Sequence, residues 1–277
     1  MKKLLLILIA VSCVVITSAQ YIDSSSKIPL NKFTVLDSAQ LKFTYNFRYK
    51  RSYSKNATDS AFVVDKQSLV IGKNISKYYS QYYFDCCERA MAKVYMEMGD
   101  GACTFEIFKN YPTHKMSVTE QAGDIFLGGN YLYIDNMSEI KWDIGKDTTT
   151  MLGYTCQKAT TTFRGRNYTA WFAPEIPSNN GPWKFGGLPG LILKISDDKR
   201  NFTFICSGIQ QLEKPEQIKL FTMNYTKVTR QQMDKIYRRY FKDPMQFWKD
   251  IHSKMVEDLS GTGIVIPKLT YNPIELE

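Results

Sequence analysis

The residue types that most often carry out catalysis are scarce in this chain and form no recognised pattern. Only two histidines occur, His114 and His252, and a Cys–His nucleophile would have to use one of them. The sequence contains no His-Glu-x-x-His, no Gly-x-Ser-x-Gly and no nucleotide-binding loop. Glu175, Asp197 and Asp198 could pair for acid/base work, but the last two lie in an expected strand turn, where aspartate is common. We therefore expect a protein that is not an enzyme, without catalytic residues, metal or cofactor.

Cysteine is the other reactive residue type, and its pattern favours structural roles. Cys13 lies in a segment expected to be removed, and five cysteines remain: Cys86, Cys87, Cys103, Cys156 and Cys206. Their spacings match no zinc site. Five is an odd number, so at least one thiol is free or pairs with another chain. The disulfide connectivity stays open, although the adjacent Cys86 and Cys87 cannot easily bond to each other without strain.

The first nineteen residues have the layout of a secretory signal peptide. Lys2 and Lys3 precede an apolar stretch over residues 4–16, and Thr17-Ser-Ala ends it with a small-residue cleavage site. The apolar stretch is shorter than the ~20 residues of a membrane span. Lipidation at Cys13 is left open, and no later segment is long and apolar enough to cross a bilayer. We expect residues 1–19 to be removed and residues 20–277 to form one exported domain.

The middle of the chain has the periodicity of strands. Residues 41–50 alternate strictly, with Leu41, Phe43, Tyr45, Phe47 and Tyr49 on one face, as in a half-buried strand. The aromatic fraction of 14% also favours strands. Further strands are expected at residues 61–71, 102–109, 114–121, 131–135, 139–144, 153–163, 167–173, 190–196 and 201–210. Many short strands with tight turns indicate an antiparallel meander.

Three helices are expected. Residues 76–98 change to a period of three or four, with Ser76 as a cap. Thr229 and Gln232 form a capping-box start, and the helix that follows has one apolar face, marked by Met233, Ile236, Tyr237, Tyr240 and Phe241. Pro244 begins a further helix. The predicted fold class is α+β, mainly β: an antiparallel curled sheet or half-barrel with one inserted helix and two C-terminal helices.

The most distinctive chemistry lies between residues 144 and 195. A predicted hairpin turns at Arg164-Gly165-Arg166-Asn167, and a segment dense in glycine and proline follows over residues 181–190. This segment could be a ligand lid or a partner-docking surface. Alternatively, its aromatic residues fold down and plug one end of the sheet. The candidate ligand or partner residues are Trp171, Trp183, Phe185, Gly186, Gly187, Leu188, Pro189 and Gly190.

At these residues the chain resembles the GLPGLI family, whose name is the string at residues 187–192. The resemblance also includes Gly153-Tyr154-Cys156-Lys158-Ala159, Gly165-Arg166, Ala170-Trp171, Ile176-Pro177, Gly181-Pro-Trp183 and the ending Tyr271-Asn-Pro-Ile-Glu-Leu-Glu277. It implies an exported protein of Bacteroides-like bacteria, in the periplasm or associated with the outer membrane. Family members are often encoded near outer-membrane nutrient receptors. No catalytic residues are implied, because no activity is established for the family.

These observations support two alternative functions. The first is a binding or carrier protein with an apolar groove inside the curled sheet. The second is an accessory subunit that docks to an outer-membrane receptor or transporter. Removal of Lys2 and Lys3 lowers the net charge from +9 to +7. Export makes nucleic acid an unsuitable partner, so the basic surface would face anionic envelope components. Its candidate residues are Arg230, Lys235, Arg238, Arg239 and Lys242.

Overall fold

A computed structural model describes residues 32–50, 62–88, 103–121, 127–137, 139–251 and 271–276. Several predictions lie outside these residues: the signal peptide with Cys13, the helical continuation over residues 89–98, and His252 with the end of the last helix. The side chains of Cys86 and Cys87 are also outside the description.

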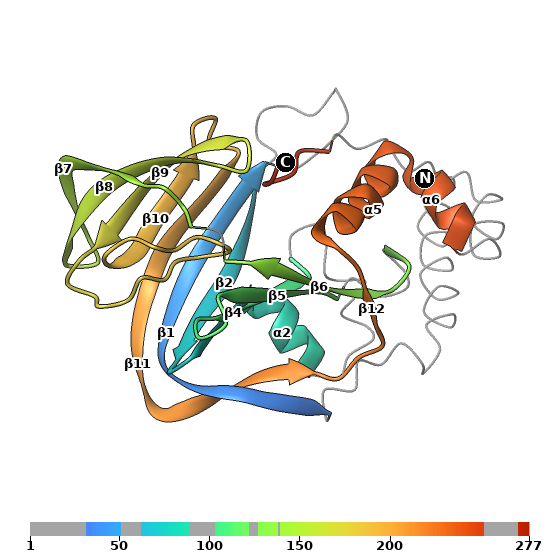
Figure 1. Ribbon diagram of the computed structural model, residues 1–277, viewed down its shortest axis with the longest axis horizontal. Helices are drawn as coiled ribbons and strands as arrows, with labels where there is room; N and C mark the ends of the chain where they lie inside the picture. The colour runs from blue at the N-terminus through green and yellow to red at the C-terminus, as the bar shows by residue number, and fades with distance from the viewer. Residues whose placement is uncertain are drawn as a thin grey trace, which may run out of the picture.

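A single twelve-stranded sheet dominates the described part of the chain (Figure 1). Its spatial order is β12-β6-β5-β4-β3-β2-β1-β11-β10-β9-β8-β7. The strands are β1 (Phe33–Lys50), β2 (Phe62–Gly72), β3 (Ile75–Ser80), β4 (Phe105–Asn110), β5 (Lys115–Glu120), β6 (Asn130–Asn136), β7 (Asp143–Met151), β8 (Tyr154–Phe163), β9 (Arg166–Ala173), β10 (Leu191–Asp197), β11 (Phe202–Phe221) and β12 (Tyr225–Lys227). Neighbours pair antiparallel, except that β12 runs parallel to β6. Among the described strands, β12 and β7 stand at opposite ends of the order and do not pair with each other, so the sheet is curled but not closed. These features confirm the predicted mainly β class.

The long strands β1 and β11 bend together and shape the sheet (Figure 1). Register shifts interrupt their ladder between Val35 and Asp37 and between Ala39 and Leu41, and such bulges bend a strand. Beyond the bend, Ala39 of β1 and Ile218 of β11 pack on a second small core. Phe43, Tyr45 and Phe47 are buried in the main core, which confirms the alternation predicted for this strand.

The predicted helix at residues 76–98 is wrong at its start. Residues 75–80 form β3, and helix α2 spans Gln81–Glu88. Ser76 does not cap a helix; instead, the Ser80 hydroxyl accepts a hydrogen bond from the Tyr83 amide at 3.2 Å. Side chains on both faces of β3 are buried. A strand that is covered on both faces has no polar side, so the sequence shows no alternation there.

Two edge elements also differ from the sequence prediction. The strand expected at residues 139–144 is β7 at Asp143–Met151, and β12 was not predicted. β7 is largely exposed on both faces, and it contains the polar run Thr148-Thr-Thr150. An edge strand without a buried face carries no hydrophobic period. β11 is about ten residues longer than predicted because its second half follows the bent end of β1.

The two C-terminal helices are confirmed. Helix α5 (Arg230–Lys242) begins with the capping box of Thr229 and Gln232. Helix α6 (Pro244–Ile251) has proline at its first position, and the Asp243 carboxylate accepts a hydrogen bond from the Gln246 amide at 3.0 Å. No helix among the described residues is long and apolar enough to cross a membrane.

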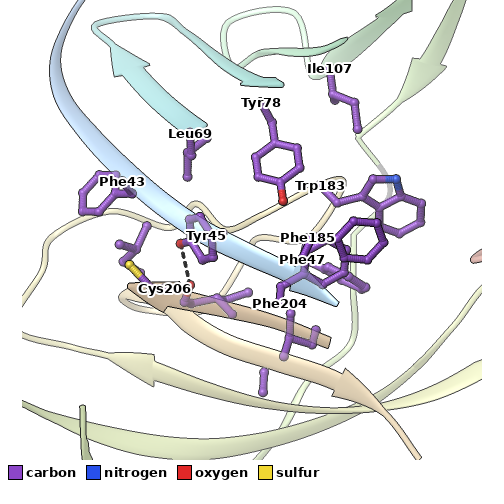
Figure 2. Close-up of a cluster of buried hydrophobic side chains, with 14 of the residues drawn as sticks. Phe43, Tyr45, Phe47, Leu69, Tyr78, Ile107, Trp183, Phe185, Phe204 and Cys206 are labelled. Carbon is purple, nitrogen blue, oxygen red and sulfur yellow. Dashed lines mark hydrogen bonds between the residues drawn. The ribbon is translucent and has the colours of Figure 1, made fainter. Parts of the chain in front are cut away.

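Aromatic residues from distant strands meet at the centre of the main core (Figure 2). The rings of Phe47 on β1 and Phe204 on β11 stack with centroids 4.3 Å apart. The Tyr45 hydroxyl donates a hydrogen bond to the Ile192 carbonyl at 2.7 Å. Trp183 and Phe185 also point into this core, although they belong to the β9–β10 loop (residues 174–190).

Candidate functional site: a cavity between the sheet and helix α5

The β9–β10 loop is folded onto the sheet, with its large apolar side chains inside. Trp183, Phe185 and Leu188 are 4%, 0% and 1% exposed. The Phe185 ring packs against the Tyr168 ring of β9, with centroids 4.8 Å apart. Only small or cyclic residues of the Gly-Leu-Pro-Gly string, such as Gly187 and Pro189, remain on the surface. The aromatic side chains of the loop therefore fill the core.

Two glycines fix the path of this loop. Gly187 has φ +87° and Gly190 has φ +152°, in the region that favours glycine. A Cβ atom on Gly190 would lie only 2.3 Å from the backbone oxygen of Ala173. The requirement for glycine at residue 190 is therefore both conformational and steric.

The buried side chain of Lys109 on β4 holds the loop through hydrogen bonds. Its ammonium donates hydrogen bonds to Asn180 Oδ1 at 3.0 Å, to the Gly181 carbonyl at 2.9 Å and to the Phe185 carbonyl at 2.5 Å. All three N–H donors are thus used by residues 180–185. Burial lowers the pKa of Lys109 to about 7.

The β8–β9 hairpin holds the C-terminal segment (residues 271–276). Its turn is Arg164-Gly165, and both residues have positive φ, as a type I′ hairpin turn requires. Arg166 Nη2 donates to the side-chain oxygen of Asn272 at 2.7 Å and to the carbonyl of Pro273 at 2.5 Å. The Leu276 amide donates to the Arg164 carbonyl at 3.0 Å. The sequence motif Gly165-Arg166 therefore serves to dock the end of the chain.

A cavity of about 540 Å³ lies between β4–β6, helix α5 and the C-terminal segment. Its size is within the range of small-molecule sites. Side chains with aromatic or aliphatic bodies form most of its wall: Phe105, Ile107, Val118, Tyr133, Trp183, Met233, Tyr237, Phe241, Tyr271, Pro273, Ile274 and Leu276. The charged residues that line it are Glu120, Lys184, Arg230, Asp234, Lys235, Arg238 and Glu275. The arrangement can therefore enclose an apolar body and present charge to it.

Glu120 is the most deeply buried of the carboxylates at this cavity, with 3% of its surface exposed. The Thr104 hydroxyl donates to Oε1, and the Tyr237 hydroxyl donates to Oε2. Burial raises the pKa of Glu120, and the hydrogen bonds from these two hydroxyl groups and from the Gln121 amide offset the rise only in part. Within the described residues, Glu120 takes part in no ion pair. The wall of the cavity thus contains a carboxyl group that lacks a cationic partner in the described part of the chain.

The structure brings together some of the candidate residues and separates others. Trp183 from the β9–β10 loop reaches the same cavity as Arg230, Lys235 and Arg238 of α5. The remaining candidates do not line it: Trp171, Phe185, Gly186, Gly187, Leu188, Pro189, Gly190, Arg239 and Lys242. Arg239 instead pairs with Asp250 of α6, and Lys242 is exposed.

Sequence reasoning missed Glu120 and Tyr237. A signal for Glu120 was present, because it continues the inward alternation of Met116 and Val118 on β5. An acidic residue at an inward position of a strand is unusual, because Asp and Glu are rarely buried without a partner. Tyr237 was identified only as part of the apolar face of α5.

The carboxylates and histidine considered for catalysis have structural or surface positions. Asp197 is buried and accepts a hydrogen bond from the Phe202 amide at 2.7 Å. Glu175 accepts one from the Thr155 amide at 3.2 Å, while His114 is exposed in a turn with φ 53°. Cys103, Cys156 and Cys206 are free thiols. The described residues contain no group of three or more His, Cys, Asp or Glu that could hold a metal ion.

Comparison with known proteins gives limited matches. A family model described as "Protein of unknown function (Porph_ging)" matches residues 162–194, from the end of β8 to β10. No curated protein matches the sequence. Structures of PNGF-II in space groups P21 and C2 are 13% and 12% identical to the chain, each with a TM-score of 0.45. Each alignment covers 72% of this chain, which spans about a third of the PNGF-II chain, 33% and 32% respectively.

Proposed function

We propose that the protein is an exported, non-enzymatic binding or carrier protein that holds an apolar ligand in the cavity beneath α5. The observation that carries this proposal is a hollow of about 540 Å³ with a mostly aromatic and aliphatic wall. Folded proteins usually fill such space with side chains, and an apolar hollow of this size is typical of a ligand site. Export rests on the expected signal peptide. Membership of a GLPGLI-type family is supported by the match at residues 162–194.

The surrounding contacts favour a preformed site. One wall is the sheet, and another is the C-terminal segment, in which Arg166 and Tyr168 bind the carbonyls of Pro273 and Ile274. Lys184 from the β9–β10 loop donates to Glu275 Oε1 at 2.8 Å. A preformed apolar cavity binds a ligand without a further ordering cost to the protein.

The β9–β10 loop gives less support to the alternative of an accessory subunit that docks on a receptor. A docking loop needs exposed anchoring side chains, and aromatic anchors are the usual ones. Here Trp183 and Phe185 are buried in the core. A docking surface on α5 would use the side away from the cavity, where Arg239 and Lys242 are exposed.

Binding of Nile red, a neutral apolar dye, tests the carrier proposal. We expect saturable fluorescence enhancement with one dye per chain and displacement by 1-decanol. Met233 on α5 is 3% exposed and lines the cavity. The Met233→Trp variant should weaken dye binding at least about tenfold, because the larger side chain occupies ligand space.

Ile236→Trp is the matched control. Ile236 lies on the same helix and is half-buried, but it does not line the cavity. Its substitution should leave the affinity for Nile red within about twofold, with thermal melting as the check on folding for both variants. The absence of saturable binding by the wild-type protein, or an equal loss in both folded variants, would overturn the proposal.

A further inference from the structure

We propose that the ligand of the cavity carries a positively charged amine on its apolar body, and that Glu120 receives this amine. The inference rests on the proposed function, because it assumes that the cavity binds a ligand. It names the class of ligand: an amphipathic ammonium compound rather than a neutral or acidic one. Three features of the cavity support this ligand class: the position of Glu120, the ion pairs that the other charged groups already form, and the aromatic wall.

Glu120 is placed at the cavity by the register of the sheet. Val118 and Glu120 are two residues apart on β5, so both side chains point to the concave face, and both line the cavity. The hydroxyl groups of Thr104 and Tyr237 hold one carboxylate oxygen each. A carboxylate has about four acceptor positions, so these two donors and the neighbouring Gln121 amide still leave capacity for a ligand N–H.

The other charged groups at the cavity already have partners or lie at its mouth. Lys184 Nζ is 2.8 Å from Glu275 Oε1 and 3.2 Å from Asp135 Oδ2. Arg238 Nε is 2.6 Å from Asp234 Oδ2. Arg230 Nη1 lies 3.9 Å from Glu275 Oε2, and Lys235 is exposed. These contacts leave Glu120 as the one carboxyl lining the cavity that no cation of the described chain approaches within 4 Å.

The charge of Glu120 acts on neutral groups. Burial raises the pKa values of Tyr237 of α5, of Cys103 next to Thr104 and of Tyr133 of β6, and the charge of Glu120 raises them further. Asp65 of β2 accepts a hydrogen bond from the Cys103 amide at 3.1 Å. Two buried acids with neutral neighbours create a negative potential in which an ammonium is favoured and a carboxylate is disfavoured.

The wall of the cavity suits the same ligand class. Six aromatic residues line it: Phe105, Tyr133, Trp183, Tyr237, Phe241 and Tyr271. Aromatic ring faces attract cations, and several rings around one acidic group are the usual surroundings of a bound alkylammonium. The apolar part of the ligand gains from burial against the same rings.

Three ligands with one tail test the proposal: decylammonium, 1-decanol and decanoate, each titrated by calorimetry or by Nile red displacement near neutral pH. We expect the wild-type protein to bind decylammonium at least about tenfold more tightly than decanol, because only the ammonium forms an ion pair with the Glu120 carboxylate. Decanoate should bind most weakly, because the carboxylate repels it. Equal affinities, or tightest binding of decanoate through the cations at the mouth, would overturn the inference while leaving the carrier function in place. Failure of all three to bind would overturn the carrier function itself.

The Glu120→Gln variant locates the effect. Its affinity for decylammonium should fall at least about tenfold more than its affinity for decanol does. Saturable decanol binding is the internal control for an intact cavity. Retention of full decylammonium affinity in this variant would show that the amine is not held by Glu120.

A measurement on the wild-type protein covers the case in which the variant does not fold. As the pH falls through the pKa of Glu120, which burial raises, the carboxylate is protonated and loses its attraction for an ammonium. Decylammonium stays charged in this range. Its affinity should therefore decrease with falling pH while that of decanol stays constant, and parallel behaviour of the two ligands would contradict the proposal.

Discussion

Lys109 and Glu120 are two buried charged residues on neighbouring strands, and they are used in opposite ways. Both are 2–3% exposed, and neither has an oppositely charged partner among the described residues. The three N–H donors of Lys109 are all taken by oxygens of Asn180, Gly181 and Phe185. Glu120 accepts hydrogen bonds from two hydroxyl groups and from the Gln121 amide, and its side chain lines the cavity.

The difference separates a structural charge from a candidate binding charge. All N–H donors of Lys109 bind oxygens of the β9–β10 loop, so its role is to hold this loop in place. Glu120 keeps unused hydrogen-bond acceptor positions beside the cavity. Its burial lowers the stability of the fold, and no ion pair among the described residues compensates for this loss. Groups of this second kind are expected where a protein gives up stability for function.

The largest expected effect concerns the loop held by Lys109. In Gly190→Ala, the new Cβ would lie 2.3 Å from the Ala173 oxygen, in a backbone conformation that alanine rarely adopts. We expect a loss of about 4 kcal/mol in the free energy of unfolding, or failure to fold. Urea denaturation followed by circular dichroism measures this loss.

Gly153→Ala is the matched control for backbone conformation. Gly153 has φ +84°, but no atom lies within 4 Å of the position of its Cβ. This variant should lose only about 1 kcal/mol, the cost of the left-handed conformation alone. Similar losses in the two variants would show that the close contact at residue 190 is relieved by a small backbone shift.

The second largest effect is expected from Lys109→Met. The substitution leaves three buried oxygens of residues 180–185 without their donor, and we expect a loss of about 3 kcal/mol in the free energy of unfolding. Lys115→Met, on the exposed end of β5, should change it by less than about 0.5 kcal/mol. Chemical denaturation of both variants at pH 6 provides the comparison.

The pH dependence of the same pair of proteins tests the charge of Lys109. Burial lowers the pKa of Lys109 to about 7 from 10.5, so between these values the unfolded chain binds a proton that the folded chain lacks. The stability of the wild type relative to Lys109→Met should therefore rise as the pH increases from 7 towards 10.5. A difference that does not vary with pH would indicate that the three oxygens keep the ammonium protonated.

The smallest effect has the opposite sign and concerns the cavity. Burial raises the pKa of Glu120, so the folded chain binds a proton more tightly than the unfolded chain does, and this contribution to stability is lost as the pH rises through the folded pKa. Above that pKa, Glu120→Gln removes a buried charge and should increase the free energy of unfolding by about 1 kcal/mol.

The exposed Glu139→Gln serves as the control and should be neutral within about 0.5 kcal/mol. Thermal melting of both variants at pH 7.5, without ligand, is sufficient to measure the effect. Destabilisation by Glu120→Gln would mean that its hydrogen bonds from Thr104 and Tyr237 outweigh its burial, and Glu120 would then resemble Lys109 as a structural charge.

The sequence predicted elements well where one face is buried and the other is not. The alternation from Leu41 to Tyr49 and the apolar face of α5 from Met233 to Phe241 are both confirmed, because half-buried elements have a clear hydrophobic period. The capping box at Thr229 and the proline at residue 244 marked helix starts by local chemistry. Prediction failed at β3 and β7, which are covered on both faces and on neither face, respectively.

The sequence predicted only part of the candidate site. Trp183, Arg230, Lys235 and Arg238 were named from their segments, but nothing in the sequence placed them at one cavity. Phe185 and Leu188 were equally good candidates by residue type, and they are core residues. Residue type shows that a side chain can bind a ligand, while burial and register decide whether it meets one.

The sequence by itself determined the mainly β class, the C-terminal helices and the unusual backbone of the segment dense in glycine and proline, because these depend on local periodicity and on the conformations of single residues. Only the tertiary structure decided that the β9–β10 loop fills the core, that this loop binds all the N–H donors of Lys109 and that Glu120 faces a cavity. These outcomes depend on contacts between residues as far apart in the chain as Lys109 and Phe185, or Glu120 and Tyr237. Such contacts are set by the curl of the sheet, and no local pattern in the chain records them.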